Sequence, residues 1–414
     1  MKPQNHSENA ILNGLRGLSV VMILTYHCFM LPVLVHYRNK PELLHQYLAG
    51  IPNFLQFIFG FDKAVDIFFI LSAYLLCNQL LKELNATSRI NFRFFYIRRA
   101  FRIMPIFLLA LFLYSIFETD LYPKLIHNLL FIDNFYHDSI VKVGWSLSIE
   151  VQFYAMLPFI LLFLYKFKNY RGFILGILFL TSLAIRYFIC LGHPELTSVT
   201  WIELLKNPDH VFDAMTKIYT PSHARFGPLI LGMGWAFLDN NKRMIERLKQ
   251  IPVGVNWIIL GLSVSLIILT LQFPAYRMDS WVYEYFGTEI NIWWLTLHRN
   301  LFGVAVMGLV ILLNYKIVPG NAGRYLSGLL SHRFWRIPAR LSFPMYLFQF
   351  PIIFVSSLIL FWTTDYTSIS HFRLTDIFYI FVIATSITVT ISILLHRFIE
   401  MPMIRIGKSL TDGT

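Results

Sequence analysis

The feature that most constrains this chain is a series of ten apolar segments divided by short polar stretches. A helix needs about 20 predominantly apolar residues to cross the hydrocarbon core of a bilayer. Only 14% of the 414 residues are charged, whereas soluble domains carry about 25%. We therefore predict an all-α, polytopic transmembrane helical bundle of about ten spans, forming one domain over residues 1–414. The spans are expected at about 15–35, 64–81, 101–117, 145–166, 172–191, 225–239, 253–271, 297–314, 341–361 and 375–397.

The distribution of basic residues predicts the orientation of these spans. If the amino terminus is inside, the inner connections hold 22 Lys and Arg residues and the outer connections hold 9. Because positively charged loops remain in the cytoplasm, both termini are predicted to be cytoplasmic. The alternation holds from loop to loop, so an error in the number of spans would have to come in pairs.

Composition also excludes several functions. The net charge of +12 does not indicate nucleic-acid binding, because the basic residues lie in short loops rather than on one soluble face. All three cysteines fall inside apolar segments, so we expect neither a disulfide framework nor a metal cluster. The sequence has no phosphate-binding glycine loop, dinucleotide fingerprint or zinc-ligand spacing. The predicted surroundings are membrane lipids.

Ionisable residues inside a span are costly and are therefore candidate functional residues. His27 is the only one of the 13 histidines well inside a predicted span. Arg16 precedes it by three helical turns, roughly 16 Å, on the same face. Glu150, in the fourth predicted span, falls at a similar depth. A carboxylate beside an imidazole would fix its tautomer and stabilise its protonated form, as a general base requires; the structural alternative for His27 is a satisfied buried hydrogen bond.

A cluster of arginines opens the third predicted span. Arg98 and Arg102 are four residues apart and share a helix face, while Arg99 points partly aside. Such a cluster suits bidentate phosphate recognition, and the alternative is a simple anchor to anionic lipid headgroups. Arg16, at the same membrane level, favours a phosphate-bearing ligand from the cytosol. Its extended arm could reach from phosphates at the mouth toward His27.

Three further polar residues lie at predicted spans and are ambiguous. Asp66 and Ser72, in the second span, could line a cavity or cap the helix. Arg225, at the outer start of the sixth span, could meet a polar acceptor or extend its charged head toward water.

Several motifs share one family resemblance. In chain order they are Leu15-Arg16-Gly17-Leu18 with His27, Asp66 to Leu75, Phe95 to Pro105, Trp145-Ser146-Leu147-Ser148-Ile149-Glu150-Val151-Gln152-Phe153-Tyr154, Leu341-Ser342-Phe343-Pro344-Met345-Tyr346-Leu347 and Glu400-Met401-Pro402. With them, the chain resembles the acyltransferase 3 family of integral membrane acyltransferases from residue 12 to about 402. The Trp-Ser-Leu-Ser-x-Glu block is the most specific. The candidate substrate-binding residues are Asp66, Ser72, Trp145, Ser148 and Arg225.

The chain departs from the family pattern at two positions. Gln349 stands where many members carry a histidine, which shifts the expected catalytic role onto His27, and Ala73 replaces a common glycine. The family often carries a soluble esterase-like (SGNH) domain after the last span. About a dozen residues follow Pro402 here, so any second step outside the membrane is expected to need a separate protein.

The resemblance implies transfer of an acyl group, commonly acetyl from acetyl-CoA, to a hydroxyl of a carbohydrate or another exported molecule. Arg16, Arg98, Arg99 and Arg102 would hold the coenzyme A phosphates. His27, oriented by Glu150, would take the proton from the acceptor hydroxyl; a covalent acyl-His27 intermediate is the variant. The expected acceptor is a cell-envelope glycan, such as lipopolysaccharide, capsule or exopolysaccharide, modified at the bacterial inner membrane without a metal.

Two other functions remain open from the sequence. One is acylation of a small exported metabolite, because nothing in the loops distinguishes it from a glycan. The other is a transporter or flippase that uses the same buried charges without chemistry. The absence of recognisable inverted repeats argues against the transporter.

Overall fold

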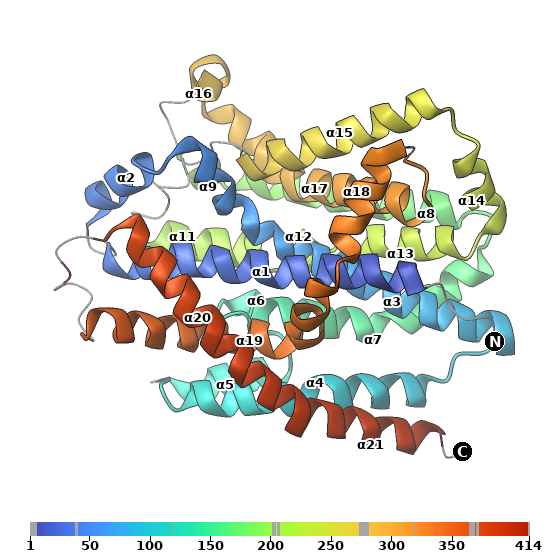
Figure 1. The fold of residues 1–414 in the computed structure, drawn as a ribbon, viewed down its shortest axis with the longest axis horizontal. Helices are drawn as coiled ribbons and strands as arrows, with labels where there is room; N and C mark the ends of the chain where they lie inside the picture. The colour runs from blue at the N-terminus through green and yellow to red at the C-terminus, as the bar shows by residue number, and fades with distance from the viewer. Residues whose placement is uncertain are drawn as a thin grey trace.

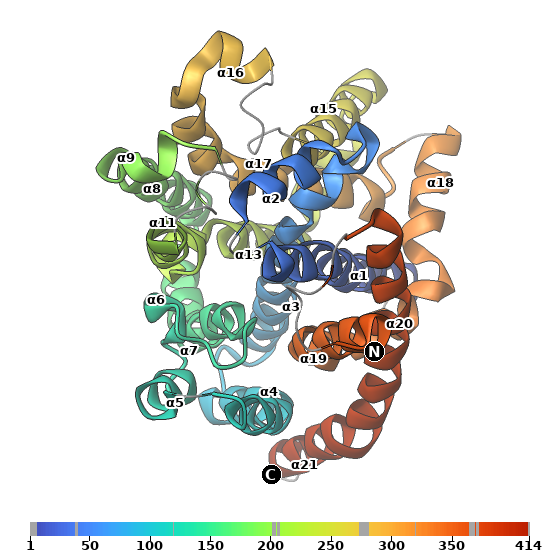
Figure 2. The same cartoon turned by 90° about the vertical axis from the view of Figure 1, so that its left-hand side faces the viewer.

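The molecule is a bundle of helices that lie largely side by side (Figures 1 and 2). The computed structural model describes residues 6–37, 40–118, 120–200, 204, 208–272, 281–318, 320–363, 369 and 372–412, and these contain helices but no strand. The helices in the first half are α1 (His6–His36), α2 (Pro41–Ala49), η1 (Asn53–Lys63), α3 (Ala64–Thr87), α4 (Phe92–Ser115), α5 (Leu121–Leu129), α6 (Asp133–Tyr136), α7 (Gly144–Lys166), α8 (Arg171–Gly192) and α9 (Pro194–Thr197). Those in the second half are α11 (Pro208–Ala214), η2 (Met215–Tyr219), α12 (Ser222–Arg225), α13 (Gly227–Asp239), α14 (Lys242–Lys249), α15 (Val253–Gln272), α16 (Trp281–Phe286), η3 (Gly287–Glu289), α17 (Ile290–Asn314), α18 (Gly320–Ser331), η4 (Arg333–Trp335), α19 (Arg336–Phe361), α20 (Leu374–Leu395), η6 (His396–Glu400) and α21 (Met401–Asp412).

The predicted all-α membrane bundle is confirmed, and eight helical segments are long and apolar enough to cross a membrane. All ten expected spans fall on helices, but those at 101–117 and 225–239 are not among the eight. The second of these is α13, whose 13 residues rise about 20 Å, less than the ~30 Å of a hydrocarbon core. The first is α4, which begins earlier than expected and includes the arginine cluster. The count of ten spans remains a prediction.

Helix α3 lies at the centre of the bundle and positions much of the site. In the span that contains it, 78% of the most apolar window is buried, against 22% for α8 and for α15. α3 packs against α13 and α1, and α1 packs in turn against α19. The exposed faces of α8 and α15 carry large apolar side chains such as Phe173, Leu180 and Leu262, as expected of surfaces that contact lipid.

A tight turn connects α3 to α4 and fixes where the arginine cluster begins. Ser88 ends α3 in the left-handed conformation, with φ of 58°. The Glu83 carboxylate accepts the backbone N–H of Asn91 at 2.7 Å, and the Asn91 side chain accepts the N–H of Phe94 at 3.0 Å. These bonds satisfy donors that a helix start leaves unpaired, so α4 begins at a defined residue.

The contact between α3 and α13 explains how Ala73 is accommodated. A Cβ atom placed on Gly232 would lie 2.8 Å from the Ala73 Cβ and 2.3 Å from the carbonyl oxygen of Ile70. The two backbones approach closely because position 232 has no side chain. The methyl group of Ala73 occupies that space.

The bundle has two ends, which we name by what lies there. α1 begins and α21 finishes at the right-hand end in Figure 1, the terminal end, where α14 also lies. α2, α9 and α16 lie at the opposite, distal end. Having both chain termini at one end agrees with an even number of crossings; the side of the membrane they face remains a prediction.

Candidate functional site

Three of the predicted arginines converge on one cavity toward the terminal end, which we call the arginine cavity. Its volume is about 390 Å³. Arg16 comes from α1, whereas Arg99 and Arg102 come from the first half of α4. The other polar residues lining it are Ser72, Gln79, Ser146, Glu150, Tyr154, Ser342 and Tyr346. Five helices that are far apart in the sequence, α1, α3, α4, α7 and α19, therefore build a single cationic cavity.

The arginine cluster divides differently from the sequence prediction. Arg99, expected to point aside, lines the cavity together with Arg102. Arg98 instead donates from Nε to the Thr411 hydroxyl on α21 at 2.8 Å and borders a smaller cavity of about 250 Å³. The cause is the packing of α4 against α21, since the helix side that meets α21 cannot also face α3 and α7.

Hydroxyl groups and one carboxylate complete the arginine cavity. Ser72 and Tyr154 are hydrogen-bonded at 2.6 Å, as are Ser146 and Tyr346 at 2.7 Å. The Glu150 carboxylate interacts with Ser72 and Tyr154 and with the charges of Arg16 and Arg102. The cavity wall thus carries three guanidinium groups and one carboxylate, an excess of positive charge that suits an anion.

The surroundings of Arg16 and Arg99 are consistent with a phosphate-bearing ligand. Nε of Arg99 is buried and has no hydrogen-bond partner among the described residues. Glu400, a buried carboxylate of the terminal motif bonded to Nδ1 of His396 at 2.7 Å, contributes a weak favourable charge at Arg16. Glu400 does not line the cavity.

His27 lies deeper in the bundle, next to α19 rather than beside Glu150. Its ring packs against Phe350 at 4.6 Å and Tyr26 at 5.4 Å between ring centroids, and its polar neighbour is Gln349. Nδ1 is buried without a hydrogen-bond partner among the described residues. The structure thus gives His27 and Glu150 different polar neighbours. Gln349 lies one helical turn beyond Tyr346 of the arginine cavity on α19, but His27 itself lines none of the described cavities.

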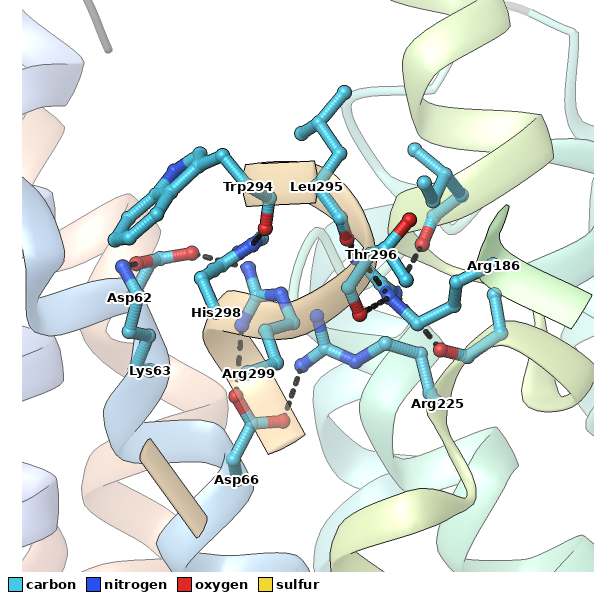
Figure 3. A network of polar contacts seen from close by, with 12 residues as sticks. Asp62, Lys63, Asp66, Arg186, Arg225, Trp294, Leu295, Thr296, His298 and Arg299 are labelled. Carbon is cyan, nitrogen blue, oxygen red and sulfur yellow. Dashed lines mark hydrogen bonds and ion pairs between the residues drawn. The ribbon is translucent and has the colours of Figure 1, made fainter. Parts of the chain in front are cut away.

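A second group of buried charges, which we call the ionic layer, consists of Asp62, Lys63, Asp66, Arg186, Arg225 and Arg299 (Figure 3). Asp66 is fully buried and accepts from Arg225 and Arg299, each at 2.9 Å. Arg299 also pairs with Asp62, which in turn contacts Lys63 at 3.4 Å. Buried charges are stable only when they are paired and hydrogen-bonded, so this layer holds η1, α3, α12 and α17 in one register.

Aromatic rings and backbone carbonyls complete the layer. The Arg225 guanidinium lies 5.1 Å from the Trp145 ring and 5.3 Å from the Tyr219 ring, a cation–π arrangement. Arg186 donates to backbone carbonyls, including those of Leu295 at 2.9 Å and Ala224 at 2.8 Å. Asp66, Trp145 and Arg225, all predicted to bind substrate, are thus brought together in this layer and do not line the arginine cavity.

Ser148 has a different place from the one predicted. It is buried and donates a short hydrogen bond to Asp133 of α6, which also accepts from Ser139. Burial raises the pKa of Asp133 above its usual value, while these two hydrogen bonds act in the opposite direction. Ser148 therefore anchors the connection between α6 and α7.

A second cavity, which we call the distal cavity, lies on the far side of the ionic layer. Its volume is about 160 Å³, and Tyr26, Asp62 and Lys63 contribute to its wall. The ionic layer borders both cavities: Asp62 and Lys63 line the distal one, Asp66 lines neither, and Val65 and Ser72 line the arginine cavity.

Of the predicted site residues, Arg16, Ser72, Arg99, Arg102 and Glu150 share one cavity. Tyr154 and Tyr346 also line this cavity; both stand in the motifs quoted above but were not predicted as site residues. Asp62 and Arg299 were not predicted either, because they fall at the edges of the predicted spans. They could have been found by searching the predicted spans and their edges for an acidic and a basic residue at equal depth, because charges in a membrane are usually paired.

Comparison with known proteins agrees with this picture. The family profile described as "Acyltransferase domain", of the acyltransferase 3 family, matches residues 9–397. Among curated proteins, the peptidoglycan O-acetyltransferase OatA of Listeria monocytogenes is 25% identical over 419 residues, which cover 96% of this chain and 56% of that protein. The O-acetyltransferase OatA of Staphylococcus aureus is also 25% identical, over 96% of this chain and 57% of that protein.

This chain spans little more than half the length of those relatives. No solved structure matches it.

Proposed function

Because this chain belongs to the acyltransferase 3 family, we propose that it transfers an acetyl group from acetyl-CoA to a hydroxyl of a cell-envelope glycan, across the bacterial inner membrane. The observation that carries the proposal is the convergence of Arg16, Arg99 and Arg102 on one cavity. Both similar OatA proteins are named O-acetyltransferases, and one of them a peptidoglycan O-acetyltransferase.

The arginine cavity is the proposed donor site. Guanidinium groups bind phosphate oxygens bidentately, and the unpaired Nε of Arg99 offers a further donor. In the proposed orientation, with both termini cytoplasmic, this cavity faces the cytosol, where coenzyme A thioesters are made. Apolar side chains between the arginines and Tyr346, including Phe68 and Leu75, would accommodate the pantetheine arm.

His27 is the proposed general base. It would take the proton from the acceptor hydroxyl as the oxygen attacks the thioester carbonyl, and the thiolate of coenzyme A would leave. Glu150 enters the proposal as the carboxylate that orients the arginines and Tyr154, because its polar neighbours lie in the arginine cavity. The proposal requires the thioester to reach the ring of His27 from that cavity past Tyr346 and Gln349.

The test is acetyl transfer by purified protein in lipid nanodiscs. Labelled acetyl-CoA and envelope glycan should yield an O-acetyl ester together with free coenzyme A. We expect His27→Ala to lower the turnover number at least 100-fold, because general base catalysis contributes about 10² to 10⁴, with little change in coenzyme A affinity. Glycan transport into proteoliposomes without coenzyme A release would refute acyl transfer, and full activity of His27→Ala would refute the base.

A further inference from the structure

The distal cavity has a composition that the donor site does not explain. Aromatic faces from Tyr26, Tyr219 and Trp294 share its wall with the charged or titratable groups of Lys63 and His298. Aromatic faces beside hydrogen-bonding groups suit a ligand with both apolar and polar surfaces.

The cavity carries unbalanced positive charge. Asp62 is the only carboxylate that lines it within the described part of the chain, and it is shared between Arg299 and Lys63. Arg186 also lines the cavity and is bonded to neutral carbonyls rather than to an acid. Asp66 and Arg225 lie next to this wall without lining the cavity. Counting them, the region holds four basic side chains and two carboxylates, those of Asp62 and Asp66.

Excess buried charge is costly unless an opposite charge compensates it. Every carboxylate oxygen of Asp66 is already engaged, by Arg225 on one side and Arg299 on the other. Among the described residues, Lys63 contacts the side chain of Asp62, at 3.4 Å, and the face of Trp294, 5.9 Å from the ring centroid, with Asp66 as a weaker and more distant charge. The described residues supply no further acid at this wall, so an anionic ligand would complete the charge balance.

His298 adds a group that can accept a hydrogen bond from a hydroxyl. Its Nδ1 lies 2.6 Å from the carbonyl oxygen of Trp294. A carbonyl oxygen can only accept, so Nδ1 must carry the hydrogen. In the neutral ring, Nε2 is then the acceptor. The wall thus combines a positive charge for an oxyanion with an acceptor for a hydroxyl.

We propose that the distal cavity binds an anionic, hydroxyl-bearing acceptor: a glycan unit that carries a carboxylate or a phosphate. Lys63 binds the oxyanion and His298 accepts a sugar hydroxyl, while the ring of Trp294 contacts the sugar. The role as acceptor rests on the proposed function, but binding to the cavity does not require acyl transfer.

The experiment measures binding of three sugars to the purified full-length protein in nanodiscs at constant ionic strength: glucuronate, glucose 6-phosphate and glucose. We expect both anionic sugars to bind at least tenfold more tightly than glucose. Lys63→Met should remove that preference, whereas Lys63→Arg should keep it and show that the fold is intact. Lys142→Met, which removes a positive charge from an exposed side chain outside the cavity, should bind like the parent.

The three sugars and the variants together distinguish the possible results of this binding experiment. Preference for one anionic sugar alone identifies the oxyanion as carboxylate or phosphate, and either result supports the proposal. Equal binding of all three sugars, or an unchanged preference in Lys63→Met, overturns it. Loss of anion binding in Arg99→Gln would assign the sugars to the arginine cavity and overturn it as well. Failure of the proposed function would appear separately, as an absence of coenzyme A binding.

Discussion

Arg98 and Arg99 are adjacent in the sequence, yet their side chains serve opposite sides of α4. Arg98 connects the helix to Thr411 of α21, and Arg99 contributes to the arginine cavity. The difference follows from the rotation of about 100° between successive helix residues. A mutation series across this cluster therefore separates a ligand contact from a contact that holds two helices together.

The first prediction at this scale concerns donor affinity. Arg99→Gln should raise the KM for acetyl-CoA about tenfold or more, because a charged hydrogen bond to phosphate contributes about 1.5–3 kcal/mol. Arg93→Gln is the matched control, since Arg93 is exposed on the same helix and lies outside the cavity. Steady-state kinetics with labelled acetyl-CoA measure both, and equal KM values for the two variants would contradict the donor site.

The second prediction concerns Asp133 and pH. Its folded-state pKa is raised by burial, so the folded protein binds the proton more tightly than the unfolded chain does. Its contribution to stability is therefore fully present below the unfolded pKa, 3.8, and is lost as the pH rises through the folded pKa.

Asp133→Asn cannot titrate. The difference in unfolding temperature between this variant and the parent, measured in detergent from about pH 4 to pH 7, should change with pH and then become constant. A difference that is the same at every pH would show that Asp133 does not titrate abnormally in the folded protein. Asp209→Asn is a suitable control, because it removes a carboxylate from a different element, α11.

At the scale of the elements, the bundle depends on close helix contacts that contain no side chain. Gly232 of α13 faces the backbone of α3, whereas Gly234, two residues later, has nothing within 4 Å of where its Cβ would lie. Gly232→Ala should destabilise the protein by about 1–3 kcal/mol through overpacking. Gly234→Ala should be neutral or stabilise it by up to ~1 kcal/mol. Thermal unfolding in detergent compares the two, and an equal effect would exclude the close contact.

The elements also show what the sequence could predict. Hydrophobic runs predicted every long helix, because the bilayer requires long apolar segments. They missed where α4 begins, since this start depends on the Asn91 cap and the Glu83 contact rather than on hydropathy. The expected span at 225–239 coincides with the short helix α13, and whether it crosses the membrane stays a prediction.

The site was less predictable than the fold. Sequence motifs identified Arg16, Arg99 and Glu150, and the structure brings them into one cavity. Depth along two helices suggested that Glu150 meets His27, but depth carries no information on the direction in which each helix face points. The charge partners of Asp66 lie 159 and 233 residues away, and only tertiary packing determines such pairs.

For the whole molecule, the positions of the chain ends yield a topology test. All three native cysteines are buried, so single cysteines can be introduced at exposed positions without a reactive background. Ser409→Cys on α21 and Asn85→Cys at the end of α3 should react with an impermeant maleimide from the cytoplasmic side. Glu284→Cys on α16 should react from the opposite side. Labelling of intact cells and of inverted vesicles measures this.

The ionic layer has a consequence for the host membrane. A protein hollowed from both ends could become a leak through which protons and small ions dissipate the energy stored across the bilayer. The carboxylate of Asp66 is held by two guanidinium groups, is fully buried and lines neither cavity, so the ionic layer would oppose such a leak. An acetyl group would therefore pass this layer by covalent transfer from one carrier to another rather than by diffusion through an open channel.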